Sequence, residues 1–116
     1  MDGTDEDGER IAADLAAGLP RGDEKAFAGL AQAALHENAL DKKSKELIAL
    51  AIGVATRCDD CIAFHAKAAV EQGASPAEIF ETLGMAIYMG AGPSVMYAAH
   101  AIDAYAQFAG REKQPA

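Results

Sequence analysis

The chain has 116 residues, which suits one domain with one hydrophobic core. Hydrophobic residues make up 51% of it and aromatic residues only 6%, and much of the apolar content is alanine, a composition that favours closely packed helices. Ten Lys and Arg against eighteen Asp and Glu give a net charge of −8 without a basic cluster, which argues against a nucleic acid partner.

The beginning of the chain is acidic and polar, and we expect residues 1–8 to be disordered. They lack the basic start and apolar segment of a signal peptide, and no apolar run approaches the length that spans a bilayer. These features predict a cytoplasmic protein without a membrane partner. We expect a helical domain over residues 9–110 and a frayed tail over 111–116.

Apolar residues recur at helical spacing in the first half of the chain. Residues 9–19 predict a short amphipathic helix. Asp23 is the expected cap of a second helix that ends near Asn38, and Asp41 is the expected cap of a third that runs to Arg57. The inner faces are predicted to hold Phe27, Leu30, Ala31, Ala34 and Leu35 in the second helix, and Leu47, Leu50, Ala51 and Val54 in the third.

The second half shows the same periodicity and no strand-like alternation. A fourth helix begins between Cys58 and Asp60 and stops before Gly73. Ser75 begins a fifth helix that breaks at 90–93, and 94–108 predict a sixth. The chain is therefore predicted to be all-α, a single-domain antiparallel bundle of five to six helices. The inner residues are expected to be Ile79, Leu83, Ala86 and Ile87, then Ala98, Ile102 and Tyr105.

The fifth and sixth helices are apolar round much of their circumference, as in ETLGMAIYMG and SVMYAAHAI. A monomer of this size cannot easily bury so much apolar surface. We therefore expect a subunit interface, and hence a homo-oligomer. A compact core helix is the alternative.

The stretch TRCDDCIAFHAK holds both cysteines of the chain and a histidine. If a helix begins near Cys58, then Cys58, Cys61 and His65 stand at positions i, i+3 and i+7 and share one face. Amide groups at a helix N-terminus favour a thiolate, a thiol one turn away can close a disulfide, and a histidine can accept the thiol proton. The spacing therefore suits the redox chemistry of a dithiol.

Two other interpretations of this stretch remain open. The two cysteines and the histidine are three potential zinc ligands, and a tetrahedral site requires a fourth. Alternatively, the cysteines are small buried residues beside a core histidine. The candidates for a fourth zinc ligand are His36, His100, Asp60 and Glu46.

Glu46 stands twelve residues before Cys58, about 18 Å away along a straight helix. In a hairpin of the third and fourth helices, however, Glu46 and His65 lie on facing stretches and can meet directly or through one water. The alternative is a first-turn glutamate that stabilises the helix dipole, and spacing alone favours it.

These residues carry a resemblance. Glu46, Cys58, Cys61 and His65 match the pattern E-x11-C-x2-C-x3-H of the alkylhydroperoxidase D-like branch of the carboxymuconolactone decarboxylase family. The flanking text from KELIALAIGV to AAHAIDAY is also similar to that branch, so the resemblance covers residues 35–105. It implies an all-helical fold that assembles into homo-oligomers, often trimers or hexamers.

The resemblance also implies a thiol-dependent peroxidase or disulfide reductase that needs no metal or cofactor. Cys61 would attack a hydroperoxide, and Cys58 would protonate the leaving alkoxide and then close the disulfide. His65 and Glu46 would relay protons, and an external dithiol or thioredoxin-like reductant would reset the pair. Members that decarboxylate a lactone typically lack the cysteine pair, so a lyase is the alternative enzyme. An oligomer that senses redox state or binds zinc is the non-catalytic alternative.

The acidic residues between the cysteines depart from this pattern. Well-known peroxidases of the branch have a histidine where this chain has Asp60, which removes one member of their proton relay. The charges of Asp59 and Asp60 would also disfavour a neighbouring thiolate. His100, with Asp103 three residues later, is expected to be a hydrogen-bonded core or interface residue, and His36 to interact with a helix dipole.

Overall fold

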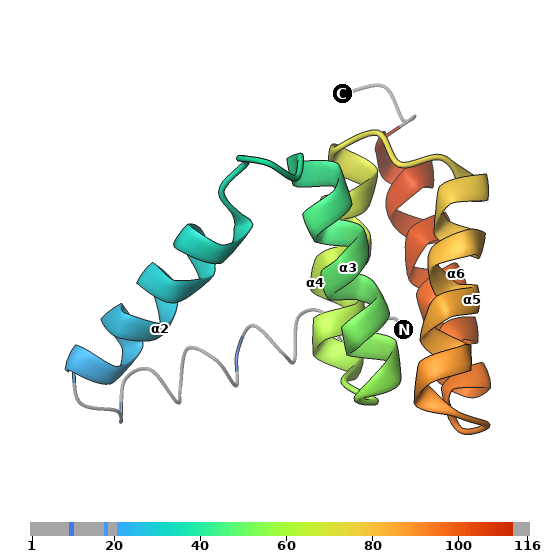
Figure 1. Ribbon diagram of the computed structural model, residues 1–116, viewed down its shortest axis with the longest axis horizontal. Coiled ribbons are helices and arrows are strands. Elements are labelled where there is room, and N and C mark those ends of the chain that lie inside the picture. The colour runs from blue at the N-terminus through green and yellow to red at the C-terminus, as the bar shows by residue number, and fades with distance from the viewer. Residues whose placement is uncertain (1–9, 11–17, 19–20, 113–116) are drawn as a thin grey trace.

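A computed structural model of the protein describes residues 10, 18 and 21–112 (Figure 1). The part of the chain that it describes contains helices and no strand, which confirms the all-α prediction. The helix expected over residues 9–19, the acidic start and the end of the tail lie outside the described residues, apart from Arg10 and Gly18. The helices are α2 (Arg21–Leu35), α3 (Lys42–Ala55), α4 (Asp59–Glu71), α5 (Pro76–Gly90) and α6 (Ser94–Glu112).

Helices α3 to α6 form an antiparallel bundle, in which α3 packs against α4 and α5, and α4 packs against α6 (Figure 1). Its core is built mainly from alanine and aliphatic side chains. Several alanines of α6 face the core, which allows close approach of α6 to α4. The buried apolar residues are Leu50, Val54, Ile62, Ala63, Ala66, Ala69, Ala74, Ile79, Leu83, Ala86, Ala98, Ala101, Ala104 and Phe108.

Most predicted inner residues lie in this core or pack against it, but two groups do not. Ile102 of α6 is exposed, because the alanine stripe rather than the larger aliphatic residue faces α4. Helix α2 projects away from the bundle (Figure 1), so Phe27 and Leu30 are 72% and 65% exposed. Only Ala31 and Leu35 of its predicted stripe are partly covered.

The helix ends follow local signals. Asp41 caps α3 by accepting the amide of Ser44 at 2.7 Å, as predicted. Gly73 follows α4 with a φ of 78°, in the left-handed conformation that glycine adopts without steric cost. Helix α2 instead begins two residues before Asp23, which lies in its first turn, and ends before Asn38, at Leu35. Helix α6 runs through Glu112, two residues past the expected end of the domain.

The start of α5 is a capping box. Ser75 Oγ accepts the Glu78 amide at 3.1 Å, and Glu78 Oε1 accepts the Ser75 amide at 2.8 Å. The other carboxylate oxygen of Glu78 pairs with Lys43 Nζ of α3 at 2.7 Å. The hydrogen bond from Lys43, followed by that from the Ser75 backbone, lowers the pKa of Glu78 from its ordinary value of 4.5.

Replacing Glu78 with glutamine should therefore reduce stability at neutral pH but not in acid. Glutamine can keep the capping box, but it loses the charge that pairs with Lys43. Because the folded-state pKa of Glu78 is lowered, its contribution is complete above pH 4.5 and is lost as the pH falls through that lowered pKa. Urea midpoints of both proteins, at matched concentration, should differ slightly at neutral pH and converge as the pH falls below the lowered pKa of Glu78. An equal difference at both pH values would contradict this account.

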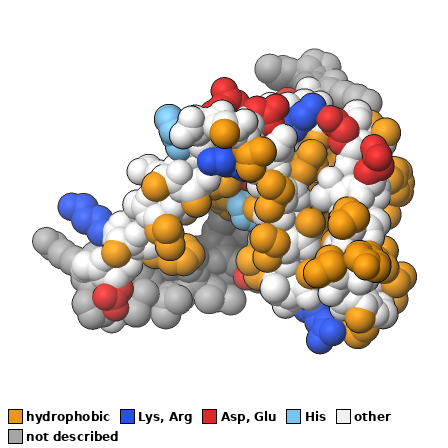
Figure 2. All heavy atoms as spheres, in the orientation of Figure 1, with side chains coloured by type: hydrophobic (Ala, Val, Ile, Leu, Met, Phe, Trp, Pro, Cys, Tyr) orange, Lys and Arg blue, Asp and Glu red, His pale blue; other side chains and the backbone are white. Residues whose placement is uncertain are grey.

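Large apolar side chains are exposed on several helices of the bundle, as Figure 2 shows for one face. The isolated chain leaves them in water, which is unfavourable for so many large apolar groups. The homo-oligomer expected from the sequence would cover them and stays a prediction.

None of the described helices is both long and apolar enough to cross a membrane, although several expose apolar side chains. The exposed groups include Phe80, Met85, Tyr88 and Met89 of α5, Val95 and Met96 of α6, and Ile48 and Ile52 of α3.

Candidate active site

The turn between α3 and α4 brings the two helices together as a hairpin. Thr56 ends α3, and Arg57 adopts a left-handed φ of 59°. The amides of Arg57 and Cys58 bond back to the carbonyls of Val54 and Gly53 at 3.1 and 2.9 Å, the pattern of a Schellman turn. Arginine occupies the position that glycine holds in the equivalent turn after α4, so the backbone before Cys58 is held in a less favoured conformation.

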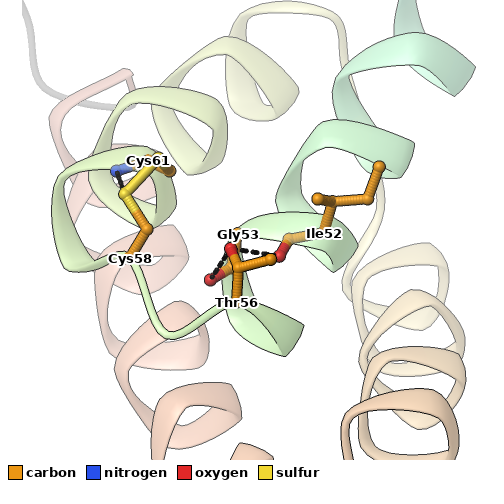
Figure 3. Close-up of a disulfide and its surroundings, with 5 residues drawn as sticks. All are labelled: Ile52, Gly53, Thr56, Cys58 and Cys61. Atoms are coloured by element: carbon orange, nitrogen blue, oxygen red, sulfur yellow. Dashed lines mark hydrogen bonds between the residues drawn. A yellow bond between two sulfur atoms is a disulfide. The ribbon is translucent and has the colours of Figure 1, made fainter.

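The turn places α4 directly against α3. A Cβ added to buried Gly53 would lie 3.2 Å from the Cβ of Cys61, so glycine permits the close approach at this point. Thr56 Oγ1 donates to the Ile52 carbonyl at 2.8 Å and closes the end of α3 (Figure 3). The first turn of α4 is therefore held at a defined distance from α3.

Cys58 and Cys61 form a disulfide at the start of α4 (Figure 3). Cys58 is the N-cap residue, and its Sγ accepts the Cys61 amide at 3.2 Å. The helix therefore begins within the predicted window and places a sulfur where amide groups stabilise negative charge. Both cysteines are partly exposed, so exogenous molecules can reach this part of the surface.

His65 lies one turn after Cys61 and meets Glu46 of α3. His65 Nδ1 is 2.7 Å from Glu46 Oε1, and only 1% of Glu46 is exposed against 20% of the His65 side chain. The two residues meet directly. Glu46 lies beyond the first turn of α3, so the first-turn glutamate that spacing alone favoured is wrong. Because a carboxylate only accepts, the hydrogen lies on Nδ1 and leaves Nε2 of His65 as the proton acceptor.

Lys42 completes this group and was not singled out from the sequence. Its Nζ is 2.9 Å from Glu46 Oε2, so each carboxylate oxygen has a partner. The ammonium supplies positive charge beside a carboxylate that is almost fully removed from water. The spacing of Lys42 and Glu46, four residues apart on one helix, is the signal that could have found this contact.

A groove beside this group runs between α2 and the α3–α4 hairpin. It has a volume of about 520 Å³, within the range of small-molecule sites. Lys42 connects the groove to Glu46, and the Phe64 ring stacks edge-on against His65 with centroids 5.0 Å apart. Figure 2 shows the hollow between α2 and the bundle. Its lining residues are Ala31, Gln32, Leu35, His36, Glu37, Lys42 and Phe64.

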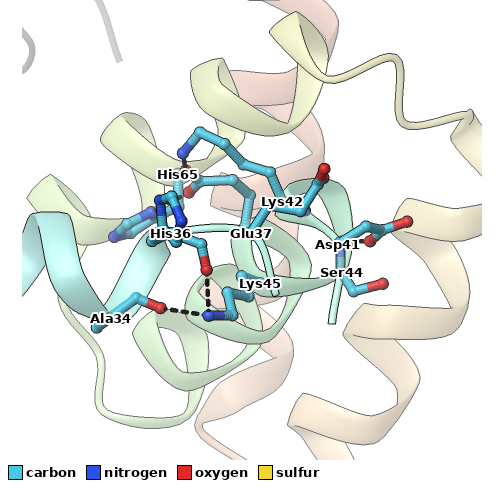
Figure 4. Close-up of polar contacts among 9 residues, drawn as sticks. Ala34, His36, Glu37, Asp41, Lys42, Ser44, Lys45 and His65 are labelled. Atoms are coloured by element: carbon cyan, nitrogen blue, oxygen red, sulfur yellow. Dashed lines mark hydrogen bonds and ion pairs between the residues drawn. The ribbon is translucent and has the colours of Figure 1, made fainter. Parts of the chain in front are cut away.

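Of the two remaining histidines, one follows the end of α2 and the other lies on α6. His36 is exposed after the end of α2, where the Lys45 ammonium bonds to the carbonyls of Ala34 and His36 (Figure 4). His100 bonds to Asp59 rather than to Asp103 of its own helix. Within residues 10, 18 and 21–112, no three His, Cys, Asp or Glu side chains converge as potential metal ligands.

Comparisons with known proteins agree with this architecture. Residues 24–104 match the Carboxymuconolactone decarboxylase family. An uncharacterized protein of Cupriavidus necator is 42% identical over 77 residues, which cover 66% of this chain and 68% of that protein. An uncharacterized protein of Haemophilus influenzae is 46% identical over 81 residues, or 70% and 72% of the two chains.

Two solved structures extend the similarity to the whole fold. Apo-lpg0406 of Legionella pneumophila, a carboxymuconolactone decarboxylase family protein, is 47% identical with a TM-score of 0.84, over 90% of this chain and 93% of that one. TM1620 of Thermotoga maritima is 31% identical with a TM-score of 0.81, over 91% of each chain. The latter is described as a family protein with a possible part in an antioxidative response. The chain belongs to the carboxymuconolactone decarboxylase family.

Proposed function

We propose that the protein is a thiol-dependent peroxidase of the alkylhydroperoxidase D-like branch, which reduces hydroperoxides through Cys58 and Cys61. The observation that carries the proposal is the adjacency of a redox-competent cysteine pair and a carboxylate-held histidine. His65 follows Cys61 by one turn on the same helix, and its Nδ1 is held by buried Glu46. The possible part of the Thermotoga maritima relative in an antioxidative response supports the same function.

In the first step the Cys61 thiolate attacks the terminal oxygen of a hydroperoxide. An S–O bond forms, the O–O bond breaks, and the alkoxide leaves with a proton from the Cys58 thiol. The products are the sulfenic acid of Cys61, an alcohol and a Cys58 thiolate. His65 Nε2 is the acceptor that takes the proton from the Cys61 thiol before the attack, because Nδ1 donates to Glu46.

In the second step the Cys58 thiolate attacks the sulfur of the Cys61 sulfenic acid. The S–S bond forms, the S–O bond breaks, and hydroxide leaves as water with the proton that His65 had accepted. An external dithiol, or a thioredoxin-like protein, then reduces the disulfide and is itself oxidised. The sum converts a hydroperoxide and a dithiol into an alcohol, water and a disulfide.

The groove between α2 and the hairpin is the approach that fits an organic hydroperoxide. Its lining includes the apolar side chains of Leu35 and Phe64 and also Lys42. An alkyl group can lie against the apolar wall while its peroxide end reaches towards the hairpin. We further propose that the protein works in the cytoplasm as a homo-oligomer, since oligomerisation would cover the exposed apolar side chains.

A titration of free thiols tests the proposal. Reduced protein, freed of reductant, should contain two free thiols per chain and lose both after one equivalent of cumene hydroperoxide. The matched control is the same protein in denaturant, which keeps both cysteines but not His65 and Glu46 beside them. Oxidation of the folded protein should be faster by about 10²-fold or more, the usual contribution of positioned acid–base groups.

Equal rates in the folded and denatured states would overturn the proposal, because the fold would then contribute nothing to the chemistry. The proposal would also be overturned if the folded protein kept its free thiols after hydroperoxide was added. Elemental analysis of the same sample, purified without a chelator, identifies the non-catalytic alternative. One zinc ion per chain that blocks thiol oxidation would favour a metal-binding protein.

A further inference from the structure

A second pair of carboxylate and imidazole lies at the start of α4, on the side of α6. His100 Nδ1 is 2.8 Å from Asp59 Oδ1, and the Tyr97 ring stacks edge-on against the imidazole at 5.2 Å. The two bonded residues are 41 positions apart in the chain, and the close packing of α4 against α6 brings them together. Nothing in the proposed catalytic cycle uses this pair.

Asp59 places this pair next to one of the two cysteines. Asp59 is the first residue of α4 and directly follows Cys58, so their Cα atoms are about 3.8 Å apart. A carboxylate this near disfavours a Cys58 thiolate through like-charge repulsion. The amide of Cys61, which points at Cys58 Sγ, acts in the opposite direction. How readily Cys58 ionises therefore depends on how far the Asp59 charge is offset.

We propose that Asp59 and His100 form a charge-compensating pair, in which the imidazole of His100 offsets the Asp59 carboxylate and so favours the Cys58 thiolate. The hydrogen bond from His100 draws the carboxylate charge towards α6 and offsets part of it. This would make His100 a positioning residue that acts on Cys58 through Asp59. Its consequence for catalysis rests on the proposed function, because Cys58 gives up its proton in the first step and attacks as a thiolate in the second.

Because the pair is partly exposed, its effect on the ionisation of Cys58 can be distinguished from a contribution to the stability of the fold. The side chains of His100 and Asp59 are 39% and 44% exposed. Partly exposed pairs of this kind contribute little to stability, because water screens them. Their effect on an adjacent thiol does not require burial, since Asp59 and Cys58 are neighbours in the chain. Substitution of either residue should therefore leave the fold intact and change the thiol.

The test measures the ionisation of Cys58 by its thiolate absorbance in a pH titration. Every variant carries Cys61→Ser, so that Cys58 is the only thiol of the chain. Adding His100→Leu should lower the ionisation constant of Cys58 about threefold, because the Asp59 charge is no longer offset. Adding Asp59→Asn should raise the constant by about threefold to tenfold, because the charge is removed. A loss of helix contacts alone would not move the constant in opposite directions.

Asp60 supplies the matched control, since it is the next acidic residue on the same turn and is exposed. His100→Leu should keep its threefold effect when Asp60→Asn is also present. It should have no effect when Asp59→Asn is present, because the imidazole then has no charge to offset. This pattern assigns the effect of His100 to Asp59 rather than to acidic residues in general.

The proposal is overturned if His100→Leu and Asp59→Asn shift the ionisation of Cys58 in the same direction. It is also overturned if His100→Leu leaves the constant unchanged, or if its effect persists without the Asp59 carboxylate. The measurement uses no hydroperoxide and no reductant. Its outcome is therefore independent of whether the protein proves to be a peroxidase.

Discussion

Replacing Cys61 with serine should abolish hydroperoxide turnover, whereas replacing Cys58 with serine should stop the cycle after the first oxidation. Without the Cys61 sulfur no sulfenic acid can form at this position, and serine is a far weaker nucleophile. Without the Cys58 sulfur the sulfenic acid of Cys61 has no resolving thiol and accumulates. The Cys58→Ser protein should lose its single thiol to one equivalent of hydroperoxide and bind dimedone at Cys61.

The N-cap position makes Cys58→Ser an informative variant. Serine is among the preferred N-cap residues, so its Oγ can accept the Cys61 amide in place of Cys58 Sγ. Helix α4 therefore keeps its cap, and lost turnover cannot be assigned to unfolding. Mass spectrometry of the dimedone adduct reports which sulfur was oxidised. Continued hydroperoxide consumption by Cys61→Ser, with dimedone found on Cys58, would reverse the proposed order of the two cysteines.

The second large effect is expected at Glu46. Replacing Glu46 with leucine should reduce the oxidation rate of the dithiol by about 10²-fold to 10⁴-fold, because His65 loses the acceptor that fixes its Nδ1 hydrogen and orients its ring. His65→Gln should reduce the rate by a similar factor. Because the two residues act as one unit, the double variant should be no slower than the slower single variant.

Stability should respond differently from activity at the same position. Removing one partner of a buried ion pair is destabilising when it leaves the other charge buried and unpaired, but here the buried charge, Glu46, is the one that is removed. His65 and Lys42 remain partly exposed, at 20% and 40%, so water can satisfy them when the carboxylate is gone. Glu46→Leu should therefore unfold at the same or a higher temperature than the wild type. A strong loss of stability together with unchanged rates would show that Glu46 serves the fold alone.

Glutamine is the more conservative substitution at Glu46, because it removes the charge of the side chain and keeps its shape. A glutamine amide can still accept from His65 Nδ1, but its NH₂ group would face the Lys42 ammonium, donor against donor. Glu46→Gln should thus retain more activity than Glu46→Leu while being the less stable of the two. The opposite order of stabilities would argue against the contact between Lys42 and Glu46.

Several ends of the helices could be predicted from the sequence because the interactions that make them are local. Asp41 accepts a hydrogen bond from the residue three positions later in the sequence, and Ser75 and Glu78, also three positions apart, bond to each other. The left-handed turn at Gly73 needs only the missing Cβ of glycine. The start of α2 was predicted less well, since an acidic residue also stabilises a helix from within its first turn, as Asp23 does.

Periodicity predicted which residues share a face of a helix, but not which face points to the core. In α6 the alanine stripe faces α4 and Ile102 points outward, because small side chains allow the helices to approach closely. In α2 most of the apolar stripe stays clear of the bundle within one chain, and Phe27 and Leu30 are exposed. Both outcomes depend on how the helices pack against one another. The apolar pattern of a single helix carries no information about that packing.

By itself the sequence determined an all-α chain in which Cys58, Cys61 and His65 share one face at the start of a helix. A hairpin of the third and fourth helices allowed Glu46 to meet His65, although spacing alone favoured a first-turn glutamate, and the contact of His100 with Asp59 was not foreseen. The tertiary structure decided both, because they join residues 19 and 41 positions apart on different helices. Such contacts depend on the register of one helix against another, which the turn at Arg57 and the close approach at Gly53 set for α3 and α4.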